Sequence, residues 1–322
     1  QSELLIFQAN QFDEFDSFSQ ELRLSNNAGE KLNWLAGVYY QKQNIDFDAN
    51  LSPFFIPPIS NFNADDPTSL LVNKTLNISE EETMSAFASV NYAITDSLRI
   101  DAGLRYTKGD KDFTISNIWG TYSGGSGEIT DRTFTPNTFN FNGFATVNAP
   151  VSTSRSDDDF LPSIGIEYDT VTGGLLYANF KQGFKAGGFN YSLRTISDSA
   201  PVGAANNVDS LNFGPEQVNA YEAGYKGSFA DGRVTTNINL FYSDYTGVQQ
   251  SVLDATTFVF SVANAAESST KGIELEGIAD LSDNFRLSSN ITLMDAQFDN
   301  FVGACSEDQN QRGTCGAVVN GV

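Results

Sequence analysis

The residue types that carry most enzyme chemistry are scarce in this sequence. Histidine is absent from all 322 residues, which removes the commonest general base, the commonest metal ligand and any Ser–His or Cys–His pair. An enzyme is not excluded by this composition, but the chemistries that depend on imidazole are. The two cysteines, Cys305 and Cys315, enclose the polar segment SEDQNQRGT, and such a close pair predicts a local disulfide in an oxidising compartment. Two reduced cysteines in a loop are the alternative.

Lysines and aromatic residues alternate in the segment FKQGFKAGGFN, residues 180–190. In an extended strand, Lys181 and Lys185 lie on one face, and Phe180 and Phe184 lie on the other. Lysine on a lipid-exposed face costs about 2–4 kcal/mol at the bilayer midplane, so in a membrane the lysine face must point to a polar interior. The glycines that follow predict a bulge or a bend where the strand ends.

The net charge of −22 argues against nucleic acid as a partner, because a phosphate backbone requires a basic surface. Acidic residues gather in SEEE, residues 79–82, and in DDD, residues 157–159. These clusters, near the expected strand ends, predict a solvated rim. The binding of divalent cations that bridge lipopolysaccharide or order the loops is the alternative.

Apolar and polar residues alternate with period two through most of the chain, which predicts strands. In LRIDAGLRYTK, residues 98–108, Leu98 and Leu104 share one face, and Arg99 and Arg105 share the other. No run of about 18 apolar residues is present, so no transmembrane helix is expected. The same alternation recurs in residues 85–95, 160–169, 272–281 and 285–293.

The connections between these strands alternate in length. The short turns contain Asn, Asp, Gly and Ser, which suit tight turns, and they would all lie at one end of an up-and-down sheet. Long polar loops at the opposite end are typical of bacterial outer-membrane barrels. The predicted turns are residues 26–30, 95–97, 171–174, 230–232 and 282–284, and the long loops are 49–79, 117–157, 190–215 and a segment from 302, with one short exception at 253–256.

The length and number of the strands favour a membrane barrel. Residues 31–49 run without a break signal, whereas about 9–11 tilted residues suffice to span a membrane. We count about eleven strands, beginning with a weak one near Glu3–Phe15. The predicted fold class is all-β, an antiparallel up-and-down transmembrane β-barrel. Because an unpaired strand edge leaves backbone groups without partners in lipid, the odd count indicates an incomplete barrel.

The segment YANFKQGFKAGGFN, residues 177–190, resembles a strand-and-loop motif of TonB-dependent outer-membrane receptors. The resemblance implies a bacterial outer-membrane barrel of roughly 22 strands with an N-terminal plug, of which about 10–11 strands would lie here. Residues 1–322 would belong to one barrel domain, with the plug, the TonB box and the last strands outside this chain. Further similar segments, in the family's order, are residues 20–41, 213–229, 239–251 and 269–298, so that the likeness covers most of residues 17–301.

The resemblance also implies a function. Members of the family take up scarce, bulky ligands with energy delivered through TonB, ExbB and ExbD, and no bond in the ligand is made or broken. We therefore expect no catalytic residue, metal site or cofactor, and we expect contact with outer-membrane lipid and lipopolysaccharide. A ferric siderophore or another iron complex is the expected ligand. Uptake of carbohydrate or cobalamin, a passive porin and a soluble β-rich binding protein are the alternatives.

The polar faces of the strands are expected to line the barrel lumen. Their charged residues would hydrogen-bond the plug and line the path of the ligand. Solvation with mutual ion pairing is the alternative for any single residue. The predicted lumenal residues are Arg99, Asp101, Arg105, Glu167, Glu222, Lys226, Glu274 and Glu276, together with Lys181 and Lys185.

Aromatic residues set among small polar ones make the long loops the expected ligand-binding region. Rigid rings provide contact area at low entropic cost, and mutual packing that orders the loops is the alternative. The two lysines of the 180–190 segment also belong to the predicted ligand-binding set, because they are cations expected to face the lumen. The predicted ligand-binding residues are Trp119, Tyr122, Phe54, Phe55, Phe139, Lys181 and Lys185.

Overall fold

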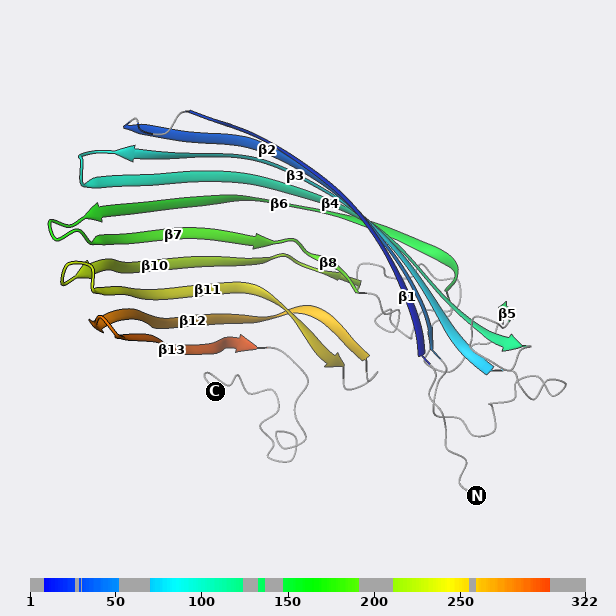
Figure 1. Cartoon of the computed structure of the whole chain (residues 1–322). Helices are drawn as coiled ribbons and strands as arrows, with labels where there is room; N and C mark the ends of the chain where they lie inside the picture. The colour runs from blue at the N-terminus through cyan, green and yellow to red at the C-terminus, as the bar shows by residue number, and fades with distance from the viewer. Residues whose placement is uncertain are drawn as a thin grey trace, which may run out of the picture.

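The computed structural model describes residues 9–26, 29, 31–51, 70–123, 133–136, 147–190, 211–254 and 259–301. Ten strands follow one another along a curved sheet, and each pairs antiparallel with the next (Figure 1). They are β1 (Ala9–Ser25), β2 (Leu32–Leu51), β3 (Leu70–Ala93), β4 (Leu98–Ser123), β6 (Val147–Asp169), β7 (Leu175–Lys185), β10 (Glu216–Phe229), β11 (Val234–Asp254), β12 (Val259–Ser282) and β13 (Phe285–Phe301).

Three short strands complete the described structure. β5 (Thr133–Pro136) pairs with β4 and brings the main sheet to eleven strands. β8 (Gly188–Phe189) and β9 (Asn212–Phe213) form a separate two-stranded sheet. In the part of the chain that the structure describes, no helix is long and apolar enough to cross a membrane. The predicted antiparallel up-and-down fold and its number of strands are therefore confirmed.

Several strands are longer than the sequence pattern indicated. β3 has 24 residues and β4 has 26, which at about 3.3 Å per residue far exceeds a hydrocarbon core of about 30 Å. The loops predicted at 49–79 and 117–157 were therefore too long. The ladder between β3 and β4 continues through residues 70–79 and 117–122, where polar residues and glycine interrupt the alternation. The first strand, predicted near Glu3–Phe15, extends farther than expected, because Ala9–Ser25 form one uninterrupted strand, and residues 3–8 lie outside the described ranges.

Apolar side chains of neighbouring strands form continuous rows on one face of the sheet. Leu104 is the Cα partner of Ala88 on β3 and of Pro162 on β6, and Ile100 is paired with Ile166. Leu104 exposes 50% of its surface and Ile166 exposes 45%, so these rows are not a buried core. A continuous apolar face of this kind is stable where hydrocarbon covers it. We call this the outward face of the sheet, and the opposite one the inward face.

Tight turns join the strands at one end of the sheet, as predicted. The hydroxyl of Thr95 accepts hydrogen bonds from the backbone N–H groups of Ser97 (3.2 Å) and Leu98 (3.0 Å). In the turn between β10 and β11, Asp231 and Gly232 have φ values of 56° and 86°. This left-handed conformation is readily adopted by Gly and, among other residues, by Asp and Asn.

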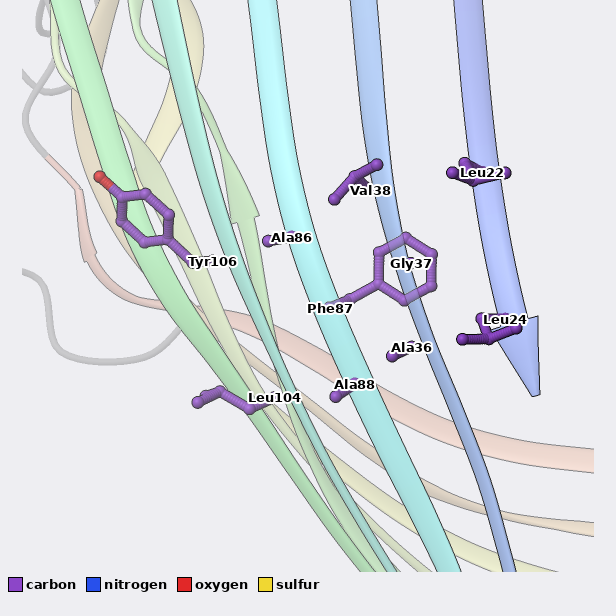
Figure 2. Close-up of a pocket in the computed structure, with 10 residues that line it drawn as sticks. All are labelled: Leu22, Leu24, Ala36, Gly37, Val38, Ala86, Phe87, Ala88, Leu104 and Tyr106. Atoms are coloured by element: carbon purple, nitrogen blue, oxygen red, sulfur yellow. The ribbon is translucent and has the colours of Figure 1, made fainter. Parts of the chain in front are cut away.

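An apolar groove of about 480 Å³ crosses the outward face of β1–β4 (Figure 2). Its floor is made of small residues, among them Ala36 and Ala88, between the leucines of β1 and the side chains of Leu104 and Tyr106 on β4. Because the groove lies on the apolar face, it is a surface for hydrocarbon and not a route through the sheet.

A close contact between strands accounts for the glycine at position 37. A Cβ there would lie 2.5 Å from Cζ of Phe87 and 2.7 Å from the carbonyl oxygen of Leu22. The aromatic ring therefore covers bare backbone on the inward face. Cross-strand pairing of an aromatic ring with glycine in this way compensates for the missing side chain of the glycine.

We expect Gly37→Ala to lower the free energy of unfolding of the full-length protein by about 1–3 kcal/mol, since a backbone oxygen cannot move aside. The control is Gly109→Ala, whose new Cβ would meet only the Thr83 hydroxyl at 3.8 Å. Folded protein in detergent is measured by heat-modifiable gel migration over a denaturant series. Equal midpoints for the two variants would contradict this account of Gly37.

Candidate functional site: the inward face of the sheet

Arg99 of β4 binds two carboxylates of β6 near the turn end of the inward face. Its Nε donates to Oε2 of Glu167 at 3.0 Å, and its guanidinium also pairs with both carboxylate oxygens of Asp169, one of them at 3.0 Å. On the neighbouring strand, Nδ2 of Asn91 donates to Oδ1 of Asp101 at 2.7 Å. Arg99 is therefore paired with Glu167 and Asp169, and Asp101 is hydrogen-bonded to an amide of the neighbouring strand.

Arg105 lies farther from the turns and has a different environment. Its NH2 group donates to the hydroxyl of Ser85 at 2.8 Å, and its Nε donates to the hydroxyl of Thr107 at 3.0 Å. The guanidinium carbon lies 5.7 Å from the ring centroid of Tyr39 and 5.5 Å from that of Phe87. Aromatic faces attract a cation at such distances. Within the described ranges, no carboxylate lies within ion-pairing distance of this guanidinium.

Glu222 is the centre of a polar network on β7 and β10. Its carboxylate accepts hydrogen bonds from the hydroxyl of Tyr177 at 3.1 Å and from Nδ2 of Asn179 at 3.3 Å. The ammonium of Lys226 lies over the ring of Tyr177, 5.2 Å from its centroid. The lysine thus contacts the aromatic face, and the carboxylate is held by neutral donors.

Two further carboxylates continue this network onto β12. Oε2 of Glu274 accepts from Asn239 and Oε2 of Glu276 accepts from Asn237, each at 3.3 Å. Among the described residues, Glu222, Glu274 and Glu276 have no Lys or Arg within ion-pairing distance, in contrast to Glu167. The inward wall of β10–β12 therefore carries a group of negative charges that are only partly compensated.

Lys181 and Lys185 lie on the loop side of that acidic group. They occupy alternate positions of β7, where Lys181 is paired with Ser163 and Ala220, and Lys185 with Glu216. Both side chains are exposed, and neither forms an ion pair with a carboxylate in the described part of the chain. The inward face thus carries free positive charge on the loop side of β7.

Of the remaining predicted ligand-binding residues, two have a described backbone position and the others lie outside the described ranges. Trp119 and Tyr122, expected in a loop, belong to β4, where they are the backbone partners of Asn73 and Leu70. The predicted loop was wrong here because β3 and β4 continue to pair well beyond the turn-side half of the sheet. The residues that lie outside the described ranges are Phe54, Phe55, Phe139, Cys305 and Cys315.

An ion pair that we did not predict from the sequence organises the end of the FKQGFKAGGFN segment. Asp157, expected on a solvated rim, exposes only 9% of its side chain and forms two hydrogen bonds with Arg155, at 2.6 and 2.7 Å. Its Oδ2 also accepts the backbone N–H of Gly187 at 3.1 Å. The sequence could have indicated this pair, because Arg155 and Asp157 are two residues apart and therefore share a face of the strand.

The glycine at position 187 is required by this ion pair. A Cβ at that position would overlap the guanidinium of Arg155 and the carbonyl oxygen of Phe213. The bend predicted at the glycines is present, since β7 ends at Lys185 and the chain continues in a different sheet as β8. Glycine is needed at position 187 because neighbouring groups approach its backbone closely. The backbone conformation does not require it, since Gly187 has no positive φ.

No group of three or more His, Cys, Asp or Glu side chains that could hold a metal ion is present within the described ranges. The acidic residues of the site instead bind amides, hydroxyls, guanidinium groups and backbone N–H groups.

The long antiparallel strands, the apolar outward face and the charged inward wall define a large membrane β-barrel of the outer-membrane class. A family model described as "TonB dependent receptor-like, beta-barrel" matches residues 3–314. The chain belongs to this family, whose barrels cross the bacterial outer membrane many times.

Solved structures share this fold at low sequence identity. The ferric yersiniabactin uptake receptor FyuA from Yersinia pestis superposes with a TM-score of 0.63 at 17% identity, covering 91% of this chain and 37% of that one. The siderophore receptor PiuA from Acinetobacter baumannii gives a TM-score of 0.58 at 18% identity, covering 96% of this chain and 41% of that one. The chain therefore spans well under half of each of these structures.

We expect Asp157→Ala to lower the free energy of unfolding by about 3 kcal/mol, because it leaves the guanidinium of Arg155 buried without its partner. The control is Asp110→Ala, which removes an exposed ion pair with Lys108 (2.7 Å) and should have little effect. Denaturant unfolding of the full-length protein, followed by heat-modifiable migration, compares the two variants. A similar loss in both would show that the burial of Asp157 contributes nothing.

Proposed function

We propose that this chain is the barrel portion of a TonB-dependent active transporter that takes up an iron complex, such as a ferric siderophore, and that it is not an enzyme. Family membership and the fold shared with two siderophore receptors support this proposal. The observation that carries it is the pair of unpaired cations, Lys181 and Lys185, on the inward face of a membrane-spanning sheet.

An anionic ligand suits these cations. Iron chelates built from carboxylate or catecholate groups carry negative charge, and an unpaired lysine in a confined lumen attracts such a ligand more strongly than one in open water does. Arg105, whose guanidinium is held by hydroxyls and aromatic faces, adds a third positive group to the wall. We propose that Trp119, Tyr122 and the aromatic residues at 54, 55 and 139 contribute ring contacts to the ligand on the loop side.

The acidic group on β10–β12 supports a second part of the proposal, a plug within the lumen. Glu222, Glu274 and Glu276 accept hydrogen bonds from neutral donors only, so their negative charge is available to basic side chains of a domain that fills the barrel. Energy from the TonB–ExbB–ExbD complex would reach the ligand through this plug. The apolar outward face would contact outer-membrane lipid and lipopolysaccharide.

The edges of the sheet support an extended barrel. Among the described strands, β1 pairs only with β2, and β13 pairs only with β12. In a membrane both free edges need partners, because hydrocarbon offers none to backbone N–H and C=O groups. We propose that residues 1–322 form part of a single barrel domain, closed by strands from elsewhere in the full-length protein, which also supplies the plug.

The transport mechanism is tested with the full-length protein in outer-membrane vesicles and in living cells. Uptake of a radiolabelled ferric siderophore should require TonB and should stop when a protonophore collapses the proton-motive force. Binding of the same chelate at low temperature, where transport is arrested, should persist without TonB. Uptake that survives both treatments, together with spontaneous ion conductance in planar bilayers, would instead indicate a passive porin.

The ligand class is tested by reversing charge. The double variant Lys181→Glu/Lys185→Glu should weaken binding of an anionic ferric chelate by about tenfold or more, because two attractive groups become repulsive. The matched control is Lys108→Glu, which changes an exposed lysine that is already paired with Asp110 and should leave affinity unchanged. Equal affinities for wild type and the double variant would remove these lysines from the ligand path.

A further inference from the structure

The wall of the sheet has a gap on its loop side. β7 has 11 residues and β10 has 14, and they are the shortest of the ten consecutive strands. β6 continues to Val147 beyond Ser163, its last residue paired with β7, and β11 continues to Asp254 beyond Thr246, its last residue paired with β10. Figure 1 shows β6 diverging from β11 and β12 beyond the ends of β7 and β10. No strand ladder joins the described parts of β6 and β11 there.

The β8–β9 pair and its flanking residues, 186–190 and 211–215, lie across this gap, and we call them the strap. Phe189 stacks on Phe113 of β4, with ring centroids 5.0 Å apart and an interplanar angle of 7°. Leu211 and Ile115 are fully buried in the same cluster. The strap therefore packs against the inward face of β4 through an apolar contact.

On the side of β6, the strap is held by side chains. Asp157 accepts the N–H of Gly187 at 3.1 Å, and Arg155 donates to the carbonyl oxygen of Phe213 at 2.5 Å. The backbone of β6 itself forms no ladder with β8 or β9. Two charged side chains, which also bind each other, thus replace the row of backbone hydrogen bonds that a neighbouring strand would provide.

On the side of β11 and β12, amide side chains perform the same role: Gln249 belongs to β11, and Asn264 belongs to β12. Asn190 accepts the N–H of Val262 at 2.6 Å and donates to its carbonyl oxygen at 2.9 Å, so that one side chain satisfies both backbone groups. Asn264 donates to the carbonyl oxygen of Gly214 at 2.9 Å. Gln249 donates to the carbonyl oxygen of Ala186, also at 2.9 Å.

We infer that the strap is a separate unit of the barrel wall, which can detach from β4, β6, β11 and β12 while the strand ladder stays intact. A ladder such as β4–β6 joins its strands through a long, nearly continuous register, whereas the strap is fastened to its neighbours by side-chain hydrogen bonds and by one apolar cluster. Local opening requires fewer hydrogen bonds to be broken here than in a ladder, and it also separates Phe189 and Leu211 from Phe113 and Ile115. The opening changes the inward surface beside Lys185, and the inference rests on the fold rather than on the transported ligand.

Hydrogen exchange of the full-length protein in detergent, followed by mass spectrometry, tests this inference. Asn190→Ala should raise exchange at 186–190, 211–215 and Val262 together by about tenfold or more, because both backbone groups of Val262 lose their partner. Peptides covering 98–106 on β4 should be unchanged. Arg155→Lys, which removes the planar fork but retains the charge, should raise exchange over the same strap residues.

The matched control is Asn179→Ala, which removes an amide on the inward face that binds Glu222 and not the strap. It should leave exchange of the strap at the wild-type rate. Faster exchange confined to Val262, without residues 186–190 and 211–215, would overturn the inference because the strap would not move as a unit. Faster exchange at 98–106 as well would also overturn it, because the strap would then be inseparable from the ladder.

Discussion

Backbone hydrogen bonding is the constraint on which this structure depends. Hydrocarbon offers no partner to an N–H or C=O group, so every strand that crosses the membrane must pair on both sides within the protein. The continuous antiparallel ladder from β1 to β13 meets that requirement for every described strand between its two edges. Because the backbone is fixed in this way, the wall varies through its side chains. Alternation then places one set of side chains toward lipid and the other toward the lumen.

The same constraint explains features that appear unrelated. Where strands approach closely, glycines such as Gly37 and Gly224 are covered by the rings of Phe87 and Tyr177, so that inward backbone is shielded without loss of the ladder. Where the ladder stops, at the ends of β7 and β10, side chains take over its role. The amide of Asn190 hydrogen-bonds both backbone groups of Val262 as a neighbouring strand would.

Charge on the inward face is distributed unevenly, and this distribution connects the fold to the proposed transport. Near the turns, Arg99 is neutralised by Glu167 and Asp169. On β10–β12 the carboxylates are bound only by neutral donors, whereas the lysines of β7 are unpaired within the described structure. The negative part of this wall suits a basic lumenal domain, and its positive part suits an anionic ligand.

The sequence by itself determined the class of fold, the tight turns and the division of each strand into an apolar and a polar face. These follow from local rules, since Leu98, Ile100 and Leu104 lie on the face opposite Arg99, Asp101 and Arg105 in any extended strand. The sequence did not show how far the strands extend, because Trp119 and Tyr122 lie in a part of β4 where the ladder continues without a regular alternation of apolar and polar residues. Nor did it show that Asp157 is buried or why Gly187 must be glycine. Those properties depend on groups far apart in the chain, such as Arg155 and Phe213, which only the tertiary structure brings into contact.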